Sequence, residues 1–319
     1  MKSVDFGRCA LGTCVAAAML AACGGSQPPI GAPEAMPQNR AHGASGSPGD
    51  LIYAATYSFG VYMFAYPSGT YVGSLQVNAA SSKGMCTDTS GNVYLLGYSG
   101  GNTYISKYAH GASKPKSKIG VLYDYNPHSC AVDPTTGNLA VYVEYIGAQD
   151  VIAIYPNASG LPTFYTIPDT EGAAQYCTYD DSGNLFADVY LGRRSATYGI
   201  AEVPAGGSTF TILTLNKNRP LGPLQWVSSY LAAAHAGKIY HLAVSGSSVR
   251  LIGITKAQGK QLPTWIQDYD VLVGAYGKHS EELALWNYPQ GGKPITIIPQ
   301  LNKHFSDLNS VLVSVAPSL

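Results

Sequence analysis

Short apolar runs alternate with turns rich in glycine, proline and serine along most of the chain. The runs carry many β-branched and aromatic residues, a pattern that predicts strands. Comparable turns recur with spacings of 42, 47, 48, 41 and 44 residues, and they follow Tyr66, Tyr108, Tyr155, Val203, Val244 and Tyr288. A repeat of about 44 residues filled with short strands is typical of a β-propeller with one blade per repeat. The pattern therefore predicts an all-β, six-bladed β-propeller with four-stranded antiparallel blades.

The third repeat shows the expected blade most clearly. Its strands are predicted over 129–133, 139–145, 150–155 and 161–167, separated by Gly-, Asn- and Pro-containing turns. The first hairpin of this unit recurs at 85–98 and 176–190. The segments 224–244 and 265–277 lack this hairpin sequence and keep only the alternation of short strands and turns. An aspartate opens each regular hairpin turn, and we expect it to bond its own backbone rather than a metal ion. These aspartates are Asp88, Asp133 and Asp180.

The two ends of the repeat region complement each other. Residues 49–57 read as the second strand of a blade that lacks a first strand, and 310–317 resembles the first strand of the third repeat. We expect the C-terminal strand to complete the first blade and to close the ring, which removes an exposed sheet edge. The propeller is predicted over 49–319.

The N-terminus is predicted to direct export. Residues 1–22 combine basic Lys2 and Arg8 with a short apolar stretch, as in a signal peptide. Leu20-Ala21-Ala22-Cys23 resembles a bacterial lipobox, which implies lipidation of Cys23, and residues 23–48 then form a flexible Gly/Pro/Ser-rich tether. The expected location is a bacterial membrane, the outer one in a Gram-negative host because Gly24 follows the cysteine. An ordinary secretory signal is the alternative.

The composition limits the kinds of binding partner that we expect for this protein. Charged residues make up only 12% of the chain, and Lys+Arg and Asp+Glu balance at 19 each, so no basic face for nucleic acid is evident. We expect the protein to be a monomer. Cys86, Cys130 and Cys177 follow the repeat spacing beyond the predicted anchor. Since three thiols cannot all pair, we interpret them as small, unpaired core residues, with a metal site as the alternative.

The hairpin CAVDPTTGNLAV (130–141) resembles NHL-type repeats, and 49–317 is similar to NHL/SMP-30-like six-bladed propellers of bacterial envelope proteins. Related propellers include gluconolactonase-like enzymes, with a divalent metal on Glu, Asn and Asp, and streptogramin B lyases, with a histidine-centred metal site. Neither set maps onto this chain: Glu144, Asp188, Glu171 and the scattered histidines share no recognisable spacing. No cofactor is predicted, and a divalent metal in the central channel is expected only under this enzyme alternative.

Aromatic residues recur where the second strand of each blade ends. Tyr57, Tyr98, Tyr145, Tyr190 and Tyr276 occupy these places, with His235 near the equivalent place in the fifth repeat. They predict either packing between blades or a recognition surface for a sugar, peptide or protein. Neighbouring loops add Tyr123, Tyr125 and Arg193 to the candidate ligand-binding residues.

The preferred function is a non-catalytic envelope lipoprotein that binds a ligand or protein partner at the propeller mouth. The alternatives are a metal-dependent lactonase, hydrolase or lyase of the related propeller families, and a scaffold without a small ligand. No catalytic residue is predicted.

Overall fold

The structure is a computed structural model that describes residues 49–57, 60–77, 79, 81–123, 125–145, 150–168, 175–191, 197–277, 282–299 and 307–317. All of them belong to one of the two units into which the chain divides, His42–Leu319. The predicted signal peptide, Cys23 and the tether lie outside the described residues, as do Arg193 and Glu171.

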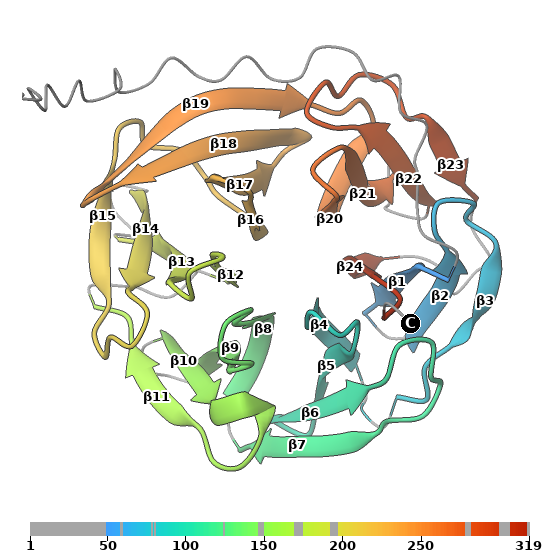
Figure 1. Cartoon of the computed structure of the whole chain (residues 1–319), viewed down its shortest axis with the longest axis horizontal. Helices are drawn as coiled ribbons and strands as arrows, with labels where there is room; N and C mark the ends of the chain where they lie inside the picture. The colour runs from blue at the N-terminus through green and yellow to red at the C-terminus, as the bar shows by residue number, and fades with distance from the viewer. Residues whose placement is uncertain are drawn as a thin grey trace, which may run out of the picture. The chain divides into compact units, whose positions relative to one another are not determined.

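Four-stranded sheets surround a common centre (Figure 1). The first sheet has the order β24-β1-β2-β3 and contains β1 (Leu51–Thr56), β2 (Gly60–Ala65), β3 (Tyr71–Ser74) and β24 (Leu308–Ser314). The second contains β4 (Ser81–Thr87), β5 (Val93–Ser99), β6 (Asn102–Tyr108) and β7 (Ser117–Leu122). The third contains β8 (Tyr125–Val132), β9 (Leu139–Tyr145), β10 (Asp150–Tyr155) and β11 (Thr163–Thr166), with the short 3-10 helix η1 (Pro156–Ala158) before β11.

The next eight strands form one sheet in two antiparallel halves. One half contains β12 (Cys177–Tyr179), β13 (Leu185–Tyr190), β14 (Tyr198–Val203) and β15 (Thr211–Leu215). The other contains β16 (Leu224–Val227), β17 (Tyr230–His235), β18 (Lys238–Ser245) and β19 (Ser248–Lys256). A short parallel pairing of β15 with β19 joins the halves. The last sheet contains β20 (Lys260–Gln267), β21 (Val271–Tyr276), β22 (Glu282–Asn287) and β23 (Thr296–Ile298).

This all-β arrangement is a β-propeller, with apolar clusters buried between neighbouring sheets. The strands β24, β4, β8, β12, β16 and β20 lie innermost (Figure 1). In the described residues, no helix is long and apolar enough to cross a membrane.

The aspartate turns form as predicted. The Asp88 Oδ1 accepts hydrogen bonds from the backbone N–H groups of Ser90 and Asn92 at 3.0 and 2.9 Å. Asp133 accepts from the N–H of Thr135, and Asp180 from those of Ser182 and Asn184. The predicted backbone bonding of these three side chains is confirmed.

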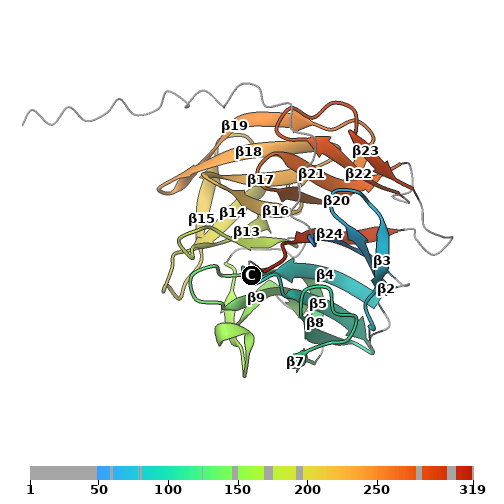
Figure 2. The same ribbon diagram turned by 45° about the vertical axis from the view of Figure 1, so that its right-hand side comes forward.

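The C-terminal strand closes the first sheet, which confirms the prediction from 310–317. β24 pairs antiparallel with β1, so that Val313 lies opposite Ile52 and Leu312 opposite Tyr53. It lies between β20 and β4 in the ring (Figures 1 and 2). His110 bonds the last residue of β24 and a residue shortly before β1, with Nδ1 2.7 Å from the Ser314 Oγ and Nε2 2.8 Å from the Gly49 carbonyl oxygen.

Direct bonds link the innermost strands of neighbouring sheets. The Met85 N–H donates to the Ser310 Oγ, which joins β4 to β24, and the Cys177 N–H donates to the Ser129 Oγ, which joins β12 to β8. The Gln225 side chain both donates to and accepts from the backbone of Ile266, which joins β16 to β20. These side chains therefore tie one sheet to the next.

The prediction that Cys86 and Cys130 are unpaired was wrong. They form a disulfide between β4 and β8, with Cα atoms 5.6 Å apart. Equivalent places on adjacent innermost strands are neighbours in the ring, so a spacing of one repeat brings two thiols together. Cys177, one repeat further on, is free and buried as predicted.

Lys260 is a buried amine at the start of β20. It is 2% exposed, its Nζ has no hydrogen-bond partner among the described residues, and it lies opposite Tyr276 in the ladder. Burial lowers the pKa of Lys260 to about 7, because the charged form loses its hydration. The folded protein therefore carries this side chain largely neutral above neutral pH.

We expect the stability of the protein to rise from pH 7 to 8.5 because of Lys260. Above pH 7 the folded amine has released its proton while the unfolded one keeps it, so the free energy of unfolding rises by up to about 1.4 kcal/mol per pH unit. Urea unfolding at pH 6.5, 7.5 and 8.5 measures this slope, and Lys260→Met should flatten it. An equal slope in the two proteins would contradict this account. Measurements stop at pH 8.5 because burial raises the pKa of the Cys177 thiol to about 12, and that thiol would add its own pH dependence above its ordinary value.

Candidate functional site

Three successive innermost strands carry a β-bulge near their first residues. The ladder slips between Ser82 and Gly84 in β4, and between Pro127 and Ser129 in β8, which leaves Lys83 and His128 as the extra residues. In β24 the ladder slips so that Asn309 is the extra residue. Bulges re-aim side chains and are common beside functional sites. We call this end of the ring, where the innermost strands begin, the mouth.

Lys83 joins two of the predicted tyrosines from neighbouring sheets. Its ammonium lies 4.5 Å from the centre of the Tyr57 ring and 5.3 Å from that of Tyr98, and it donates to the Tyr57 hydroxyl at 3.3 Å. Aromatic faces attract cations. No carboxylate in the described residues forms an ion pair with Lys83. Among the described residues, this amine therefore has two aromatic rings but no carboxylate as its partner.

His128 lies next to this cation and faces Glu144. The His128 Nε2 is 3.5 Å from the Glu144 Oε2, and its ring meets the Tyr142 ring edge-on. Burial lowers the pKa of His128, the Glu144 carboxylate opposes this, and the charge of Lys83 adds to the lowering. The imidazole is therefore neutral at pH 7, with a lowered pKa that restricts its charging to acid conditions.

The third bulge residue fastens β24 to β4. The Asn309 Nδ2 donates to the Ser82 carbonyl oxygen. In the part of the chain that the structure describes, three buried oxygens have no hydrogen-bond partner: the Ser82 Oγ, the Asn309 Oδ1 and the Asn126 Oδ1. Each such oxygen costs roughly 1–3 kcal/mol of stability. Unsatisfied groups gathered at one end of the fold are typical of functional rather than purely structural regions. We define the mouth cluster as Tyr57, Lys83, Tyr98, His128, Glu144 and Asn309.

The remaining sequence-predicted tyrosines have separate surroundings. Tyr125 stacks on Phe164 with ring centres 5.5 Å apart. The ring centres of Tyr190 and Tyr198 are 5.1 Å apart, and those of Tyr276 and Trp286 are 6.0 Å apart. Tyr123 is 70% exposed. The structure thus brings Tyr57 and Tyr98 together through Lys83 and does not join Tyr190 or Tyr276 to them within the described residues.

Some of the predicted residues lie outside the mouth cluster or outside the described residues. The side chain of Tyr145 is outside the described residues, although its backbone pairs with that of Tyr125. His235 ends β17 opposite Lys238. Among the candidate carboxylates, Asp188 is buried and its Oδ1 accepts backbone N–H bonds from Gln175 and Tyr176. Within the described residues, no group of three His, Cys, Asp or Glu side chains is arranged to hold a metal ion.

Sequence reasoning missed Lys83 and Asn309, and it named His128 only as one residue of the loop 122–129 beside the predicted tyrosines. The only signal was the separation of Lys83 and His128, which matches the repeat period. A neighbouring glycine explains how the strands come close: a Cβ on Gly84 would lie 2.7 Å from the His128 carbonyl oxygen. A bulge depends on such packing between strands, and the alternation of residues does not reveal it.

Known proteins show similarity to the chain at the level of fold. No protein-family model matches it, and no curated protein matches its sequence. A chain of the crystal structure of a nidogen–laminin complex aligns with a TM-score of 0.62 at 13% identity, covering 85% of this chain and 100% of the other. TolB from Acinetobacter baumannii aligns at 0.62 and 11% identity over 84% of this chain and 67% of the other. The Cps50 (Swd1) beta-propeller domain of Myceliophteria thermophila aligns at 0.54 and 10% identity, over 80% and 84%.

These likenesses establish the β-propeller class of fold. At such low sequence identities, the activities, ligands and partners of those proteins are not assigned to this chain.

Proposed function

We propose that the protein is a non-catalytic binding module and that the mouth cluster is its recognition surface. The observation that carries the proposal is the Lys83 ammonium, held against the rings of Tyr57 and Tyr98 without an ion-pair partner in the described residues. A tyrosine is a frequent anchor in recognition surfaces, and an unpaired cation adds a preference for anionic groups. Tyr57 is 48% exposed and therefore accessible to a ligand.

The ligand chemistry that fits best is an acidic saccharide. The face of a sugar ring can pack on the tyrosine rings while its carboxylate meets the ammonium of Lys83. A protein or peptide partner with an acidic side chain would use the same two contacts, and it is an outcome of the test below. Because burial lowers the pKa of His128, its imidazole is neutral at pH 7 and adds no second positive charge to the mouth cluster.

We expect trigalacturonate to bind the wild-type protein and to bind Lys83→Met at least about 10-fold more weakly, because one charge-assisted contact is lost. Tyr98→Ala should weaken binding in the same direction. Calorimetric titration measures both, with uncharged maltotriose and a triglutamate peptide as comparison ligands. Lys217→Met removes a charge from an exposed loop and is the matched control.

Preferential binding of the peptide would move the proposal from a saccharide to a protein partner. Unchanged affinity in Lys83→Met, or equal loss in Lys217→Met, would reject the mouth cluster as the site.

We also propose six blades, with the eight-stranded sheet counted as two. Its halves β12–β15 and β16–β19 are each antiparallel, and only Thr214 with Ser248 and Leu215 with Val249 pair between them. This count supports the predicted likeness to NHL/SMP-30-like propellers.

Export and lipidation at Cys23 remain part of the proposal. The Cys86–Cys130 disulfide supports export, because disulfides persist in oxidising compartments and are rare in the cytosol. Wild-type protein is expected in the membrane fraction of a bacterial host, and Cys23→Ser in the soluble exported fraction. Recovery of wild-type protein in the soluble fraction would contradict the anchor.

A further inference from the structure

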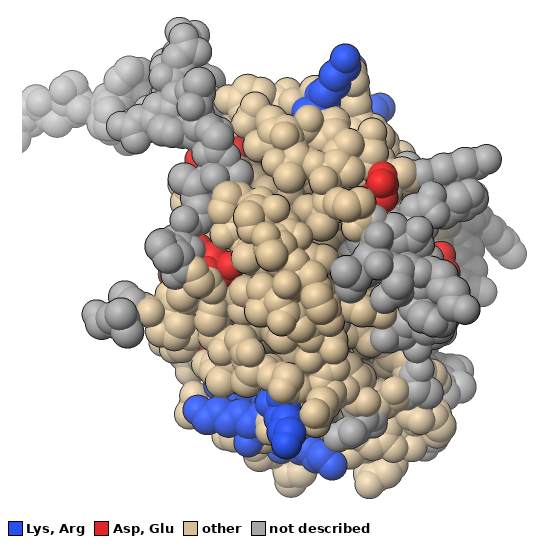
Figure 3. Space-filling model, turned by 90° about the vertical axis from the view of Figure 1, so that its right-hand side faces the viewer, with Lys and Arg blue, Asp and Glu red and all other residues tan. Residues whose placement is uncertain are grey.

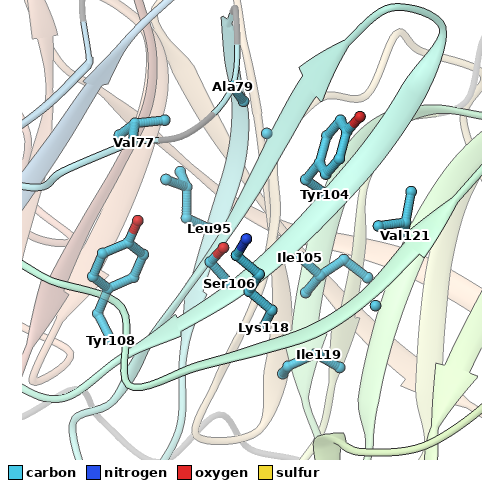
Figure 4. Close-up of a pocket in the computed structure, with 12 residues that line it drawn as sticks. Val77, Ala79, Leu95, Tyr104, Ile105, Ser106, Tyr108, Lys118, Ile119 and Val121 are labelled. Carbon is cyan, nitrogen blue, oxygen red and sulfur yellow. The ribbon is translucent and has the colours of Figure 1, made fainter.

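A pocket of about 190 Å³ lies on the second sheet, and none of the residues that line it belongs to the mouth cluster. The connection from β3 to β4 covers one side of it with Val77 and Ala79, and β5, β6 and β7 form the other (Figure 4). Part of its wall is apolar and is formed by Val77, Leu95 from β5 and Val121 from β7. The pocket thus belongs to the space where the second sheet meets the chain that leads into it.

The strands β6 and β7 supply the polar side chains of the pocket. Residues two apart on a strand share a face, so Tyr104, Ser106 and Tyr108 all point to the same side of the sheet. Ser106 lies directly opposite Lys118 of β7, and Figure 4 shows the two side chains next to each other. The sheet therefore presents a hydroxyl and an ammonium side by side at the pocket.

Two contacts fix the covering connection. The Tyr108 hydroxyl donates to the Gln76 carbonyl oxygen at 2.8 Å, and the Gln76 N–H donates to the Ser113 carbonyl oxygen at 2.7 Å. Gly97 lets the connection approach, since a Cβ at this position would lie 2.5 Å from the Ala79 Cβ. The pocket is thus built by specific contacts, as expected of a preformed ligand site.

Three donors at the pocket have no partner among the described residues. The hydroxyls of Tyr104 and Ser106 and the ammonium of Lys118 take part in no hydrogen bond or ion pair there, whereas the neighbouring Lys107 pairs with Asp88 at 3.2 Å. Lys114 and Lys116 are exposed just before Lys118. Lys and Arg side chains gather at the lower edge of the surface in Figure 3, toward the β6 and β7 end of the molecule. The local charge attracts anions.

We propose that this pocket binds a small monocarboxylate with an apolar body, of about the size of one aromatic ring. A cavity of about 150 Å³ holds benzene, whereas drug-sized ligands occupy roughly 300–1,000 Å³, so the volume selects a small molecule. The carboxylate accepts hydrogen bonds from Lys118 and Ser106, and the apolar body packs against Leu95, Val77 and Val121. This site is separate from the mouth cluster and does not depend on its function.

Phenylacetate is the probe for this site, compared with phenylacetamide, which lacks the charge, and acetate, which lacks the ring. We expect calorimetric titration to show phenylacetate binding at least about 10-fold tighter than either, and Lys118→Met to lose that advantage. Lys116→Met is the control, because this exposed neighbour does not line the pocket. Thermal unfolding of both variants verifies that they fold.

Equal affinity for phenylacetate and acetate, or equal losses in the Lys118 and Lys116 variants, would show only non-specific attraction of anions and would overturn the proposal. Absence of phenylacetate binding by the folded wild-type protein would overturn it as well.

Discussion

A chain that ends before residue 308 is expected to aggregate instead of folding as a monomer. Deletion of 308–319 removes β24, and with it the ladder partner of β1. Val311, Leu312 and Val313 are each at most 4% exposed. Burial of such side chains contributes about 1.5–3 kcal/mol each, and the whole free energy of unfolding of a protein is only about 5–15 kcal/mol. The deletion therefore removes an amount of stability comparable to the total.

The exposed edge of β1 makes aggregation the expected result. All six residues of β1 are buried, and without β24 the backbone N–H and C=O groups that β1 directs away from β2 are open to other chains. Asp50 also loses the Ala316 N–H that its Oδ1 accepts at 2.8 Å. Size-exclusion chromatography and thermal unfolding of the truncated protein measure the effect.

A control variant separates loss of the strand from loss of the contacts of one side chain. Ser314→Ala keeps β24 and removes a hydroxyl that donates to the Gly91 carbonyl oxygen at 2.5 Å and lies 2.7 Å from His110 Nδ1, so it should elute as a monomer with a modest loss of stability. A truncated protein that elutes as a monomer and melts at the wild-type temperature would refute closure of the ring by β24.

Loss of the Cys86–Cys130 disulfide is expected to lower the free energy of unfolding by about 4 kcal/mol. The bond closes a loop with a sequence separation of 44 residues, and the loss of chain entropy in the unfolded state corresponds to about 4 kcal/mol for such a loop. It also joins β4 to β8, so that removing it weakens the contact between two sheets. The double variant Cys86→Ser/Cys130→Ser should melt roughly 8–16 °C lower.

Reducing agent provides an independent test of the disulfide. Dithiothreitol should lower the melting temperature of the wild-type protein toward that of the double variant and leave the variant unchanged. Thiol labelling followed by peptide mapping should modify Cys177 only after unfolding, because that side chain is buried. Labelling of Cys86 and Cys130 in the unreduced, unfolded protein would show that the disulfide is absent.

The sequence allowed much of the fold to be predicted because strands and turns are local. The predicted ranges 139–145 and 150–155 coincide with β9 and β10, and the role of the C-terminal strand followed from the phase of the repeat. Turn residues impose backbone conformations that are visible in sequence. These features need no knowledge of which sheets are neighbours.

The features that were missed depend on contacts between sheets. Pairing of Cys86 with Cys130 requires that equivalent places on adjacent innermost strands meet. The parallel pairing of β15 with β19 also arises where two sheets approach each other. A repeat period shows that such places are equivalent without showing how far apart they lie.

The candidate site was also predicted only in part. Tyr57 and Tyr98 were predicted from their repeated place at strand ends, but Lys83, which joins them, was not. Its position follows from a bulge that shifts the ladder by one residue. A repeat of aromatic residues thus indicated one end of the fold, and the bulge determined which of them share a cation.

The most direct test of the proposed recognition surface is NMR mapping of trigalacturonate binding on the isotope-labelled protein. We predict that the amide signals of Tyr57, Lys83, Tyr98 and His128 shift together as the saccharide is added, and that the shifts disappear in Lys83→Met. Shifts confined to other parts of the propeller, or shifts that persist unchanged in Lys83→Met, would contradict the assignment of the mouth cluster as the binding site.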